Sequence, residues 1–444
     1  MKKTFPHPLI IMLIFVILSG IFTYFIQSGE YERRFDEKTG REVVIPGSFH
    51  TVEDQNTSIN EIVLSIPEGL VEGADILVLI LLIGGAFYVI EKTGALQVGI
   101  ESLIYTFRKS HFLLLFLIGI IFSICGATIA MQEELIAMAP ILILLSKKLH
   151  YDQRSIVALT LGCAMVGSSF SPINPFGGLL SSKIAEVDFN YGLIFRGITL
   201  LVVVLIWIIF HIKTGKNRND QIDIPDFKPV TISTRHKVIL LIMTLGILVM
   251  GWGIAKHDWD YNEMSGLFFV VGITCGLIGK LGVNGTAKTY SEGFSEMIFA
   301  GVIVGLARSI YFVLNQSSSI DPLIQSLFEP LQTLPTYAAA FGMFLSQALI
   351  HIPVPSTSGQ AVLTTPITAP LTDLLGISRL VAVMSYQFPA GLMDLITPTN
   401  GGLMAVIAAV GVNYKDWFSY IWKSFLLLMV LGLISIILAT VYFS

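Results

Sequence analysis

The stretch Asp394–Met404, DLITPTNGGLM, places a carboxylate beside a proline, an asparagine and two glycines within an otherwise apolar run. Proline removes a backbone donor and clashes with the preceding helical turn, whereas glycine lets the backbone turn sharply or approach a ligand. Backbone groups freed in this way cannot stay unpaired in hydrocarbon, so the break must line protein or a water-filled cavity. The stretch predicts a membrane helix interrupted beside a binding site, with these candidate residues: Asp394, Thr397, Thr399, Asn400 and Gly401.

A second stretch, SPINPFGG at residues 171–178, has the same composition, and its candidates are Ser171, Asn174 and Gly177. An asparagine side chain offers both donors and acceptors. A half-helix that starts after such a break directs N–H groups at an anion, and the half-helix before it offers carbonyl groups to a cation. The breaks at Asn174 and Asn400 could therefore form a sodium site. The alternative is that they are kinks that serve only helix packing.

Charged and polar side chains also occur at two predicted hairpin tips and in one apolar run. Burying a charge in a membrane is costly and usually tied to function. The candidates are Glu133, Glu134, Arg308, Ser356, Thr357, Ser358 and Gln360. These residues could instead have structural roles. Glu133–Glu134 could form a solvent-facing tip, and Asp394 could form a structural ion pair with Arg308. We expect His351 to be a packed or interfacial histidine rather than a proton carrier.

Composition indicates which solvent surrounds the chain. Of its 444 residues, 54% are hydrophobic and 13% charged, and the mean hydropathy is +0.76. Soluble domains have about 25% charged residues, so we expect contact with membrane lipid. A net charge of −4 gives no basic field for nucleic acid. The sequence contains no H-E-x-x-H or G-x-S-x-G motif, and we predict neither an enzyme nor a cofactor.

Charge placement predicts the topology and the domains. Lys2 and Lys3 before the first apolar run indicate a cytoplasmic N-terminus, and the basic segment KTGKNRND indicates a cytoplasmic loop. We expect a first membrane helix (about Pro8–Gln27) and an extracytoplasmic loop within 1–72. Two repeats are predicted at 73–213 and 293–444, joined by linking helices at 214–292. The predicted hairpins cover about 112–147 and 336–375, with short arms, and the predicted broken helices cover about 154–186 and 379–412.

An internal repeat supports this division. A shift of 226 residues superposes Pro140 on Pro366, Pro172 on Pro398 and Asn174 on Asn400. The first unit starts outside the cell and the second inside, so they would be inverted repeats, which are common in secondary transporters. The predicted fold class is an all-α polytopic membrane protein with two inverted repeats, each with a re-entrant hairpin and a broken helix.

The phrases GLARSI, PSTSGQA and PAGLMDLITPTNGG make the chain resemble the YfcC/DcuC-type carriers of the ion transporter superfamily. That resemblance implies a homodimeric elevator-type carrier of the bacterial inner membrane, in which a transport domain slides against a scaffold. It also implies a C4-dicarboxylate or a basic amino acid as substrate. By this resemblance, Glu133–Glu134 and Ser356–Gln360 are hairpin tips, and Ser171–Gly178 and Thr397–Gly402 are helix breaks. Dicarboxylate-binding members often carry Ser-Asn-Thr at the tips, whereas this chain has M-Q-E-E and S-T-S-G.

The count of charges near mid-membrane also favours an amino acid over a C4-dicarboxylate as the substrate. A dianion needs compensating positive groups, yet we expect only Arg308 near mid-membrane, beside three carboxylates. The predicted function is a secondary active transporter of a small carboxylate-bearing metabolite. A basic amino acid, exchanged or taken up with an ion, is the first choice, with Na⁺ or H⁺ as the coupling ion. A C4-dicarboxylate carrier is the alternative, and an ion channel a distant one.

Overall fold

The computed structural model describes residues 7–37, 41–107, 110–132, 134–188, 190–215, 231–257, 259 and 261–443. Within them, seven helices are long and apolar enough to cross a membrane. The first apolar segment forms a shorter helix than the predicted Pro8–Gln27, because α1 ends at Phe22. Glu133, one of the predicted site residues, lies outside the described residues.

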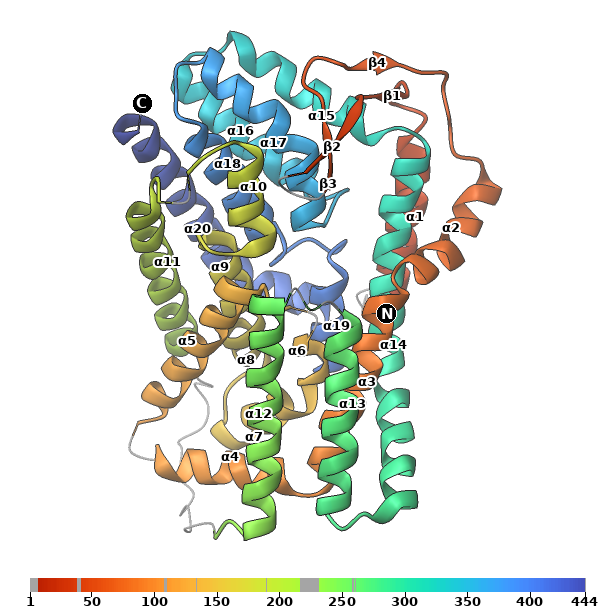
Figure 1. Cartoon of the computed structure of the whole chain (residues 1–444), viewed down its shortest axis with the longest axis vertical. Coiled ribbons are helices and arrows are strands. Elements are labelled where there is room, and N and C mark those ends of the chain that lie inside the picture. The colour runs from red at the N-terminus through yellow and green to blue at the C-terminus, as the bar shows by residue number, and fades with distance from the viewer. Residues whose placement is uncertain are drawn as a thin grey trace, which may run out of the picture.

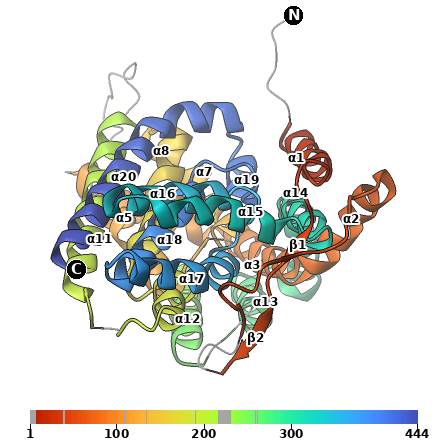
Figure 2. The same cartoon turned by 90° about the horizontal axis from the view of Figure 1, so that it is seen from above.

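Five helices pack on one another and form what we call the α14 group (Figures 1 and 2). They are α1 (Pro8–Phe22), α2 (Ile59–Glu72), α3 (Ala74–Lys92), α13 (Tyr261–Ile278) and α14 (Gly282–Gln316). Glycines let α3 and α14 approach closely, since a Cβ atom on Gly293 would lie 2.9 Å from Cα of Gly85. Helix α14 is longer than the expected crossing, and it continues through the domain boundary expected between 292 and 293.

A second set of helices, which we call the α18 group, lies on the opposite side of the molecule (Figure 2). Its members include two hairpins and two interrupted helices. They are α5 (His111–Ile129), α7 (Ala139–Leu149), α8 (Gln153–Val157), η1 (Ala158–Gly162), α9 (Cys163–Phe170), η2 (Pro175–Leu179), α10 (Leu180–Ile184), α11 (Leu193–Thr214), α16 (Thr336–Ile350), α17 (Thr357–Leu374), α18 (Arg379–Met393) and α20 (Tyr414–Tyr442).

The hairpin of α5 and α7 lies in the lower half of Figure 1, and the hairpin of α16 and α17 lies in the upper half. Two short helices lie between the groups: α6 (Glu134–Ala137) contacts α3, and α19 (Gly401–Ala409) contacts α14. The first hairpin arm is longer than predicted, because α5 has 19 residues. It ends at Ala130, which has a left-handed backbone (φ 53°).

The helix breaks follow from local chemistry. A residue before proline avoids the α conformation, and both Ser171 (ψ 126°), before Pro172, and Asn174 (ψ 123°), before Pro175, are extended. In the second half, α18 ends at Met393 and α19 begins at Gly401, with Pro398 between them. Both interruptions occur where the sequence predicted them.

The predicted all-α class needs one correction, because the loop after α1 contains four short strands. They pair as β1 (Gly29–Glu30) with β4 (His50–Thr51), and β2 (Arg33–Asp36) with β3 (Arg41–Val44). The segment expected to be a long loop also contains α2, which a capping box of Ser58 and Glu61 starts. The remaining helices are α4 (Ala95–Thr106), α12 (Thr234–His257), α15 (Ile320–Phe328) and η3 (Glu329–Thr333).

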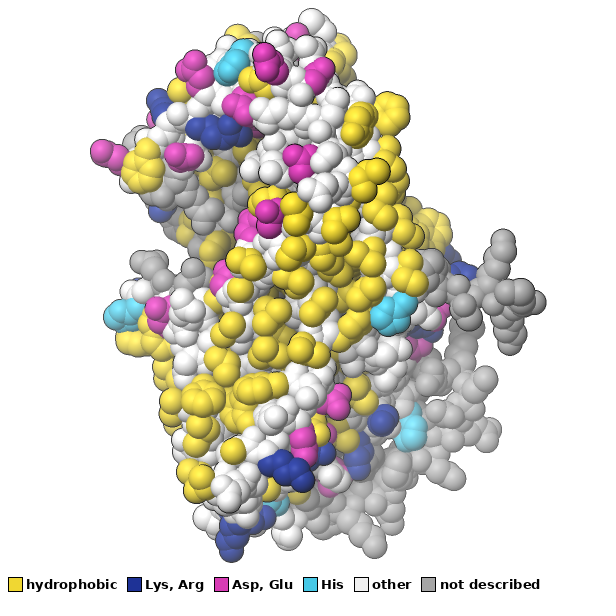
Figure 3. Space-filling view, turned by 90° about the vertical axis from the view of Figure 1, so that its right-hand side faces the viewer, with side chains coloured by type: hydrophobic (Ala, Val, Ile, Leu, Met, Phe, Trp, Pro, Cys, Tyr) yellow, Lys and Arg dark blue, Asp and Glu magenta, His cyan; other side chains and the backbone are white. Residues whose placement is uncertain are grey.

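One outer face carries the surface expected of a chain surrounded by lipid. Hydrophobic side chains cover the middle of the face in Figure 3, and charged side chains gather toward its upper and lower ends. Helix α1 contributes Ile14, Ile17 and Ile21, each 44–50% exposed. Apolar side chains exposed in a continuous band are stable against lipid rather than water.

Candidate functional site

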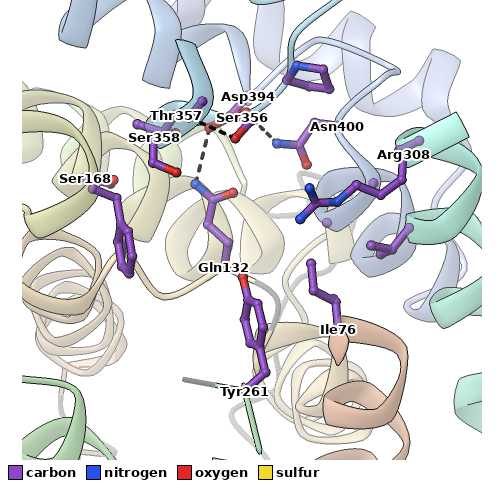
Figure 4. Close-up of a pocket in the computed structure, with 18 of the residues that line it drawn as sticks. Ile76, Gln132, Ser168, Tyr261, Arg308, Ser356, Thr357, Ser358, Asp394 and Asn400 are labelled. Carbon is purple, nitrogen blue, oxygen red and sulfur yellow. Dashed lines mark hydrogen bonds between the residues drawn. The ribbon is translucent and has the colours of Figure 1, made fainter. Parts of the chain in front are cut away.

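A cavity of about 550 Å³ lies between the α14 group and the α18 group. Residues of α3, α13 and α14 line one side, and both hairpin tips and the second helix break line the other (Figure 4). The predicted site residues that line it are Glu134, Arg308, Ser356, Thr357, Ser358, Asp394, Thr399, Asn400 and Gly401. Residues from positions more than 260 apart in the sequence therefore meet at one place.

Asp394 is almost fully buried (2% exposed) and accepts hydrogen bonds from three elements. His351 Nε2 lies 2.8 Å from its Oδ1, Gln132 Nε2 lies 3.3 Å from its Oδ2, and Asn400 Nδ2 also donates to Oδ1. The alternative of an ion pair with Arg308 is wrong, because the partner of Asp394 is His351. Gln132 also donates its backbone N–H to Glu134 Oε2 (3.1 Å), so it links two carboxylates of the cavity.

Arg308 reaches the cavity from α14. Among the described residues that line the cavity, it has the one positively charged side chain. It makes no hydrogen bond or ion pair within the part of the chain that the structure describes. Glu72, at the end of α2, lines the same side of the cavity and was not predicted. A guanidinium that has no protein partner and lies beside a cavity can bind a carboxylate in a bidentate manner, through two parallel hydrogen bonds.

Two helices begin at the cavity. Ser356 caps α17 by accepting from Gly359 N (3.2 Å), and Asn400 caps α19 by accepting from Leu403 N (2.7 Å). Residues at both starts line the cavity. Helix N-termini carry partial positive charge and unsatisfied N–H groups, so both starts favour an anion.

At the first break, Ser168 and Phe176 line the cavity, whereas the side chains of Ser171 and Asn174 bond to other protein groups. Asn174 Oδ1 accepts from Gly177 N (2.8 Å), and its Nδ2 donates to Ser168 Oγ (2.9 Å). Ser171 donates to Ala127 O at 2.7 Å. The amide oxygens of Asn174 and Asn400 therefore serve as helix caps, and we assign no metal ligand at either break. Among the described residues, no group of three or more histidine, cysteine or carboxylate side chains could hold a metal ion.

Five other predicted residues lie behind the cavity wall. Ser171, Asn174 and Gly177 belong to the first break, and Gln360 is fully buried against His351. Thr397 is also buried, and its hydroxyl lies 3.4 Å from that of Thr399. Two of them bond toward lining residues, because Gln360 bonds to His351, the partner of Asp394, and Thr397 bonds to Thr399.

Sequence reasoning missed several residues that complete the breaks. Gln387 donates to the carbonyl oxygens of Ser168 (3.0 Å) and Ser171 (2.7 Å) and accepts from Arg196 (2.8 Å). Arg196 is 2% exposed, so Arg308 is not alone among arginines within the bundle, although Arg196 does not line the cavity. The unusual charge in the run LIFRGITLL was the signal available in the sequence.

Two residues of α20 satisfy backbone carbonyl groups of the second break. Trp417 Nε1 donates to Leu395 O (2.7 Å), and the Tyr414 hydroxyl donates to Ile396 O. The aromatic residues of α20 carried no sequence signal that linked them to the break, because they precede the long apolar run of that helix.

A family model described as the C4-dicarboxylate anaerobic carrier, DcuC, matches residues 5–441, which is nearly the whole chain. The chain belongs to the DcuC family. This confirms the resemblance seen in the sequence, and together with the seven apolar helices it makes the chain a multi-pass membrane transporter.

Two curated proteins and one solved structure are similar to the chain over most of its length. The chain is 29% identical to "Putative basic amino acid antiporter YfcC" of Escherichia coli K12, covering 93% of this chain and 92% of YfcC. It is 28% identical to an uncharacterised protein of Haemophilus influenzae, covering 90% and 82% of the two chains. The solved MtrF transporter of Neisseria gonorrhoeae matches with 16% identity and a TM-score of 0.47, covering 100% and 96%.

Proposed function

We propose that this member of the DcuC family is a secondary carrier whose substrate is an amino acid, with basic amino acids preferred. The observation that carries the proposal is the charge around one cavity. Its lining includes three carboxylates, Glu72, Glu134 and Asp394, and one guanidinium, Arg308. A ligand with more positive than negative charge complements that set.

The α-carboxylate of the substrate has a defined place in this proposal. Arg308 and the starts of α17 and α19 all face the cavity and favour an anion. A charge-assisted hydrogen bond contributes about 1.5–3 kcal/mol. The cavity therefore offers hydrogen-bond donors for one carboxylate.

The cationic end of the substrate would lie at Asp394 and Glu134, which Gln132 links. A carboxylate placed there would face two protein carboxylates, and repulsion between like charges grows as water is excluded. This is why we place the ammonium or guanidinium group, and not a second carboxylate, against Asp394.

We also infer alternating access of the elevator type, with the α18 group as the transport domain and the α14 group as the scaffold. The position of the cavity between the groups supports this. So does the order of elements, because α5 to α11 and α16 to α20 each give a hairpin, an interrupted helix and a long helix. We expect the N-terminus to be cytoplasmic, the membrane to be the bacterial inner membrane and the carrier to be a homodimer.

A C4-dicarboxylate remains the second candidate for a specific reason. Arg308 and two helix starts could together bind a carboxylate strongly, and the family description names that substrate class. The two candidates differ in their second charged group, because Glu134 and Asp394 would repel a second carboxylate.

A thermal-shift panel on the purified full-length protein separates the candidates. Arginine, lysine and ornithine should raise the melting temperature, and the shift should shrink in Glu134→Gln. Succinate and fumarate should leave it unchanged. Stabilisation by succinate or fumarate, without any by the basic amino acids, would contradict the proposal. The conservative substitution Glu186→Gln, at a residue that pairs with Arg379 away from the cavity, is the matched control.

A further inference from the structure

His351 is fully buried, and both nitrogens of its ring have a partner. Nδ1 lies 2.7 Å from Gln360 Oε1, and Nε2 lies 2.8 Å from Asp394 Oδ1. His351 does not line the cavity, whereas Asp394 does. Asp394 therefore stands between the imidazole and the cavity.

The hydrogen bonds around the pair fix where its protons lie. Gln360 Nε2 donates to the backbone carbonyl of Gln347 (2.8 Å), which can only accept, so the Gln360 oxygen faces His351. His351 Nδ1 must then carry a proton. Asn400 is oriented by Leu403 N, which donates to its Oδ1, so its Nδ2 donates to Asp394 Oδ1. One further proton lies between His351 Nε2 and Asp394 Oδ1, and with it the pair is neutral.

The other half of the chain shows that a break can be built without this pair. The positions 226 residues before His351 and Asp394 are Cys125 and Ser168. Asn174 still donates to Ser168 and caps the following half-helix there. The ionisable pair is therefore not needed to interrupt the helix.

Other ionisable groups share the cavity but not the imidazole. The elements packed around His351 present Gln360 and Asp394 to the nitrogens of its ring. The remaining described ionisable residues that line the cavity with Asp394 are Glu72, Glu134, Tyr261, Arg308 and Tyr311. Of the residues that line the cavity, Asp394 is the one that the structure shows bonded to the ring of His351.

We propose that the His351–Asp394 pair releases one proton when the cationic group of a substrate binds Asp394, so that the carrier exchanges a cation for a proton. This rests on the function proposed above. An uncompensated carboxylate is costly inside the membrane, so Asp394 needs one positive charge in every state. The imidazolium supplies it in the empty carrier, and the substrate supplies it in the loaded one.

The step conserves charge. The Nε2–H bond of His351 breaks, its electron pair stays on nitrogen, and the proton passes to Asp394 Oδ1. It then leaves for water in the cavity while the ammonium or guanidinium group takes its place beside the carboxylate. The imidazole stays neutral, with its Nδ1 proton held by Gln360, until substrate leaves and a proton returns.

The test is proton release on binding, measured with a pH-indicator dye in weakly buffered solution at neutral pH. Full-length protein is titrated with arginine, lysine, ornithine and succinate, and binding is followed in parallel by thermal shift. We expect about one proton released for each arginine bound. The titration is repeated from about pH 6 to pH 8. His351→Gln leaves Asp394 to hold the proton of the empty carrier by itself, so arginine should still bind, but the pH at which release is half-maximal should move by at least about one unit. An unchanged pH dependence would contradict the role of His351. Asp373→Asn, which changes an exposed residue paired with Arg379, should behave as wild type.

A second substitution, His351→Asn, keeps the test decisive if His351→Gln does not fold. It also removes the imidazole and leaves Asp394 in place, so it should bind arginine and show the same change in the pH dependence of release. Binding of arginine by the wild type without proton release would overturn the inference and leave the proposed function standing. Binding of succinate alone would overturn both, because no cation would replace the proton.

Discussion

The side-chain amide of Asn400 donates a hydrogen bond to the carboxylate of Asp394, six residues earlier in the chain. Asn174 makes the same bond to Ser168, also six residues earlier. In both places the asparagine oxygen caps the half-helix that follows. The two breaks share one construction, and they differ in whether it holds a hydroxyl or a carboxylate.

Asp394→Asn should nearly abolish transport while the protein still folds. Asparagine has the shape of aspartate and can still accept from Gln132, but it lacks the charge that we assign to substrate binding. Loss of one charge-assisted contact of about 1.5–3 kcal/mol corresponds to roughly 10–150-fold in transport efficiency. Counterflow of radiolabelled arginine measures the loss, and gel filtration reports folding. Unchanged transport would return Asp394 to a structural role.

Arg308→Ala should weaken substrate binding more than it slows turnover. We expect KM to rise by about 10–100-fold, because the guanidinium binds the substrate carboxylate by charge-assisted hydrogen bonds. Arg308→Lys should recover part of the loss, because lysine keeps the positive charge but cannot form the bidentate hydrogen bonds of a planar guanidinium. Arg379→Ala is the control, because Arg379 pairs with Asp373 away from the cavity. A fall in kcat with unchanged KM would contradict this role.

Gln387→Leu should destabilise the fold. Gln387 is buried and satisfies the carbonyl oxygens of Ser168 and Ser171 as well as the guanidinium of Arg196. Each buried polar group left unsatisfied costs about 1–3 kcal/mol, so we expect a loss of about 3–5 kcal/mol in the free energy of unfolding.

Chemical denaturation in detergent measures that loss. Gln97→Leu, on the exposed face of α4, should change stability by no more than about 0.5 kcal/mol. Equal effects of the two substitutions would show that the Gln387 network adds nothing to the first break.

Glu101→Gln should show a small stability loss that depends on pH. Lys148 lies 2.6 Å from Glu101, and this bond lowers the pKa of that carboxyl from 4.5. A carboxyl whose pKa is lower in the folded state stabilises the protein above its unfolded pKa. That stabilisation is lost as the pH falls through the lower folded value.

Both side chains are partly exposed, so the effect should be about 0.5 kcal/mol at pH 7 and should vanish below the folded pKa. Helix α4 lies outside the seven candidate membrane spans. Thermal denaturation of wild type and Glu101→Gln across this pH range is the measurement. A difference that persisted in strong acid would rule out the ion pair as its cause.

Local chemistry made much of the architecture predictable. The prolines at 172, 175 and 398 restrict the residues before them, so the breaks could be placed without tertiary information. Apolar runs located the long helices. The capping box of Ser58 and Glu61 could have revealed α2, but the polar composition of its surroundings concealed it.

Contacts between distant segments were not predictable in the same way. His351 and Asp394 are 43 residues apart, and they meet only because α16 packs against α18. Arg196 was visible as a charge in an apolar run, but its partner Gln387 lies 191 residues away. The sequence predicted that Asn174 and Asn400 lie at the two helix breaks. Their role as helix caps became evident only from the backbone around them.

Counterflow in proteoliposomes loaded with unlabelled arginine or succinate tests the central claim most directly. The account predicts that radiolabelled arginine enters arginine-loaded vesicles that contain the wild-type carrier, and that vesicles with Asp394→Asn behave like empty ones. Accumulation of radiolabelled succinate in succinate-loaded vesicles, with no arginine exchange, would contradict it.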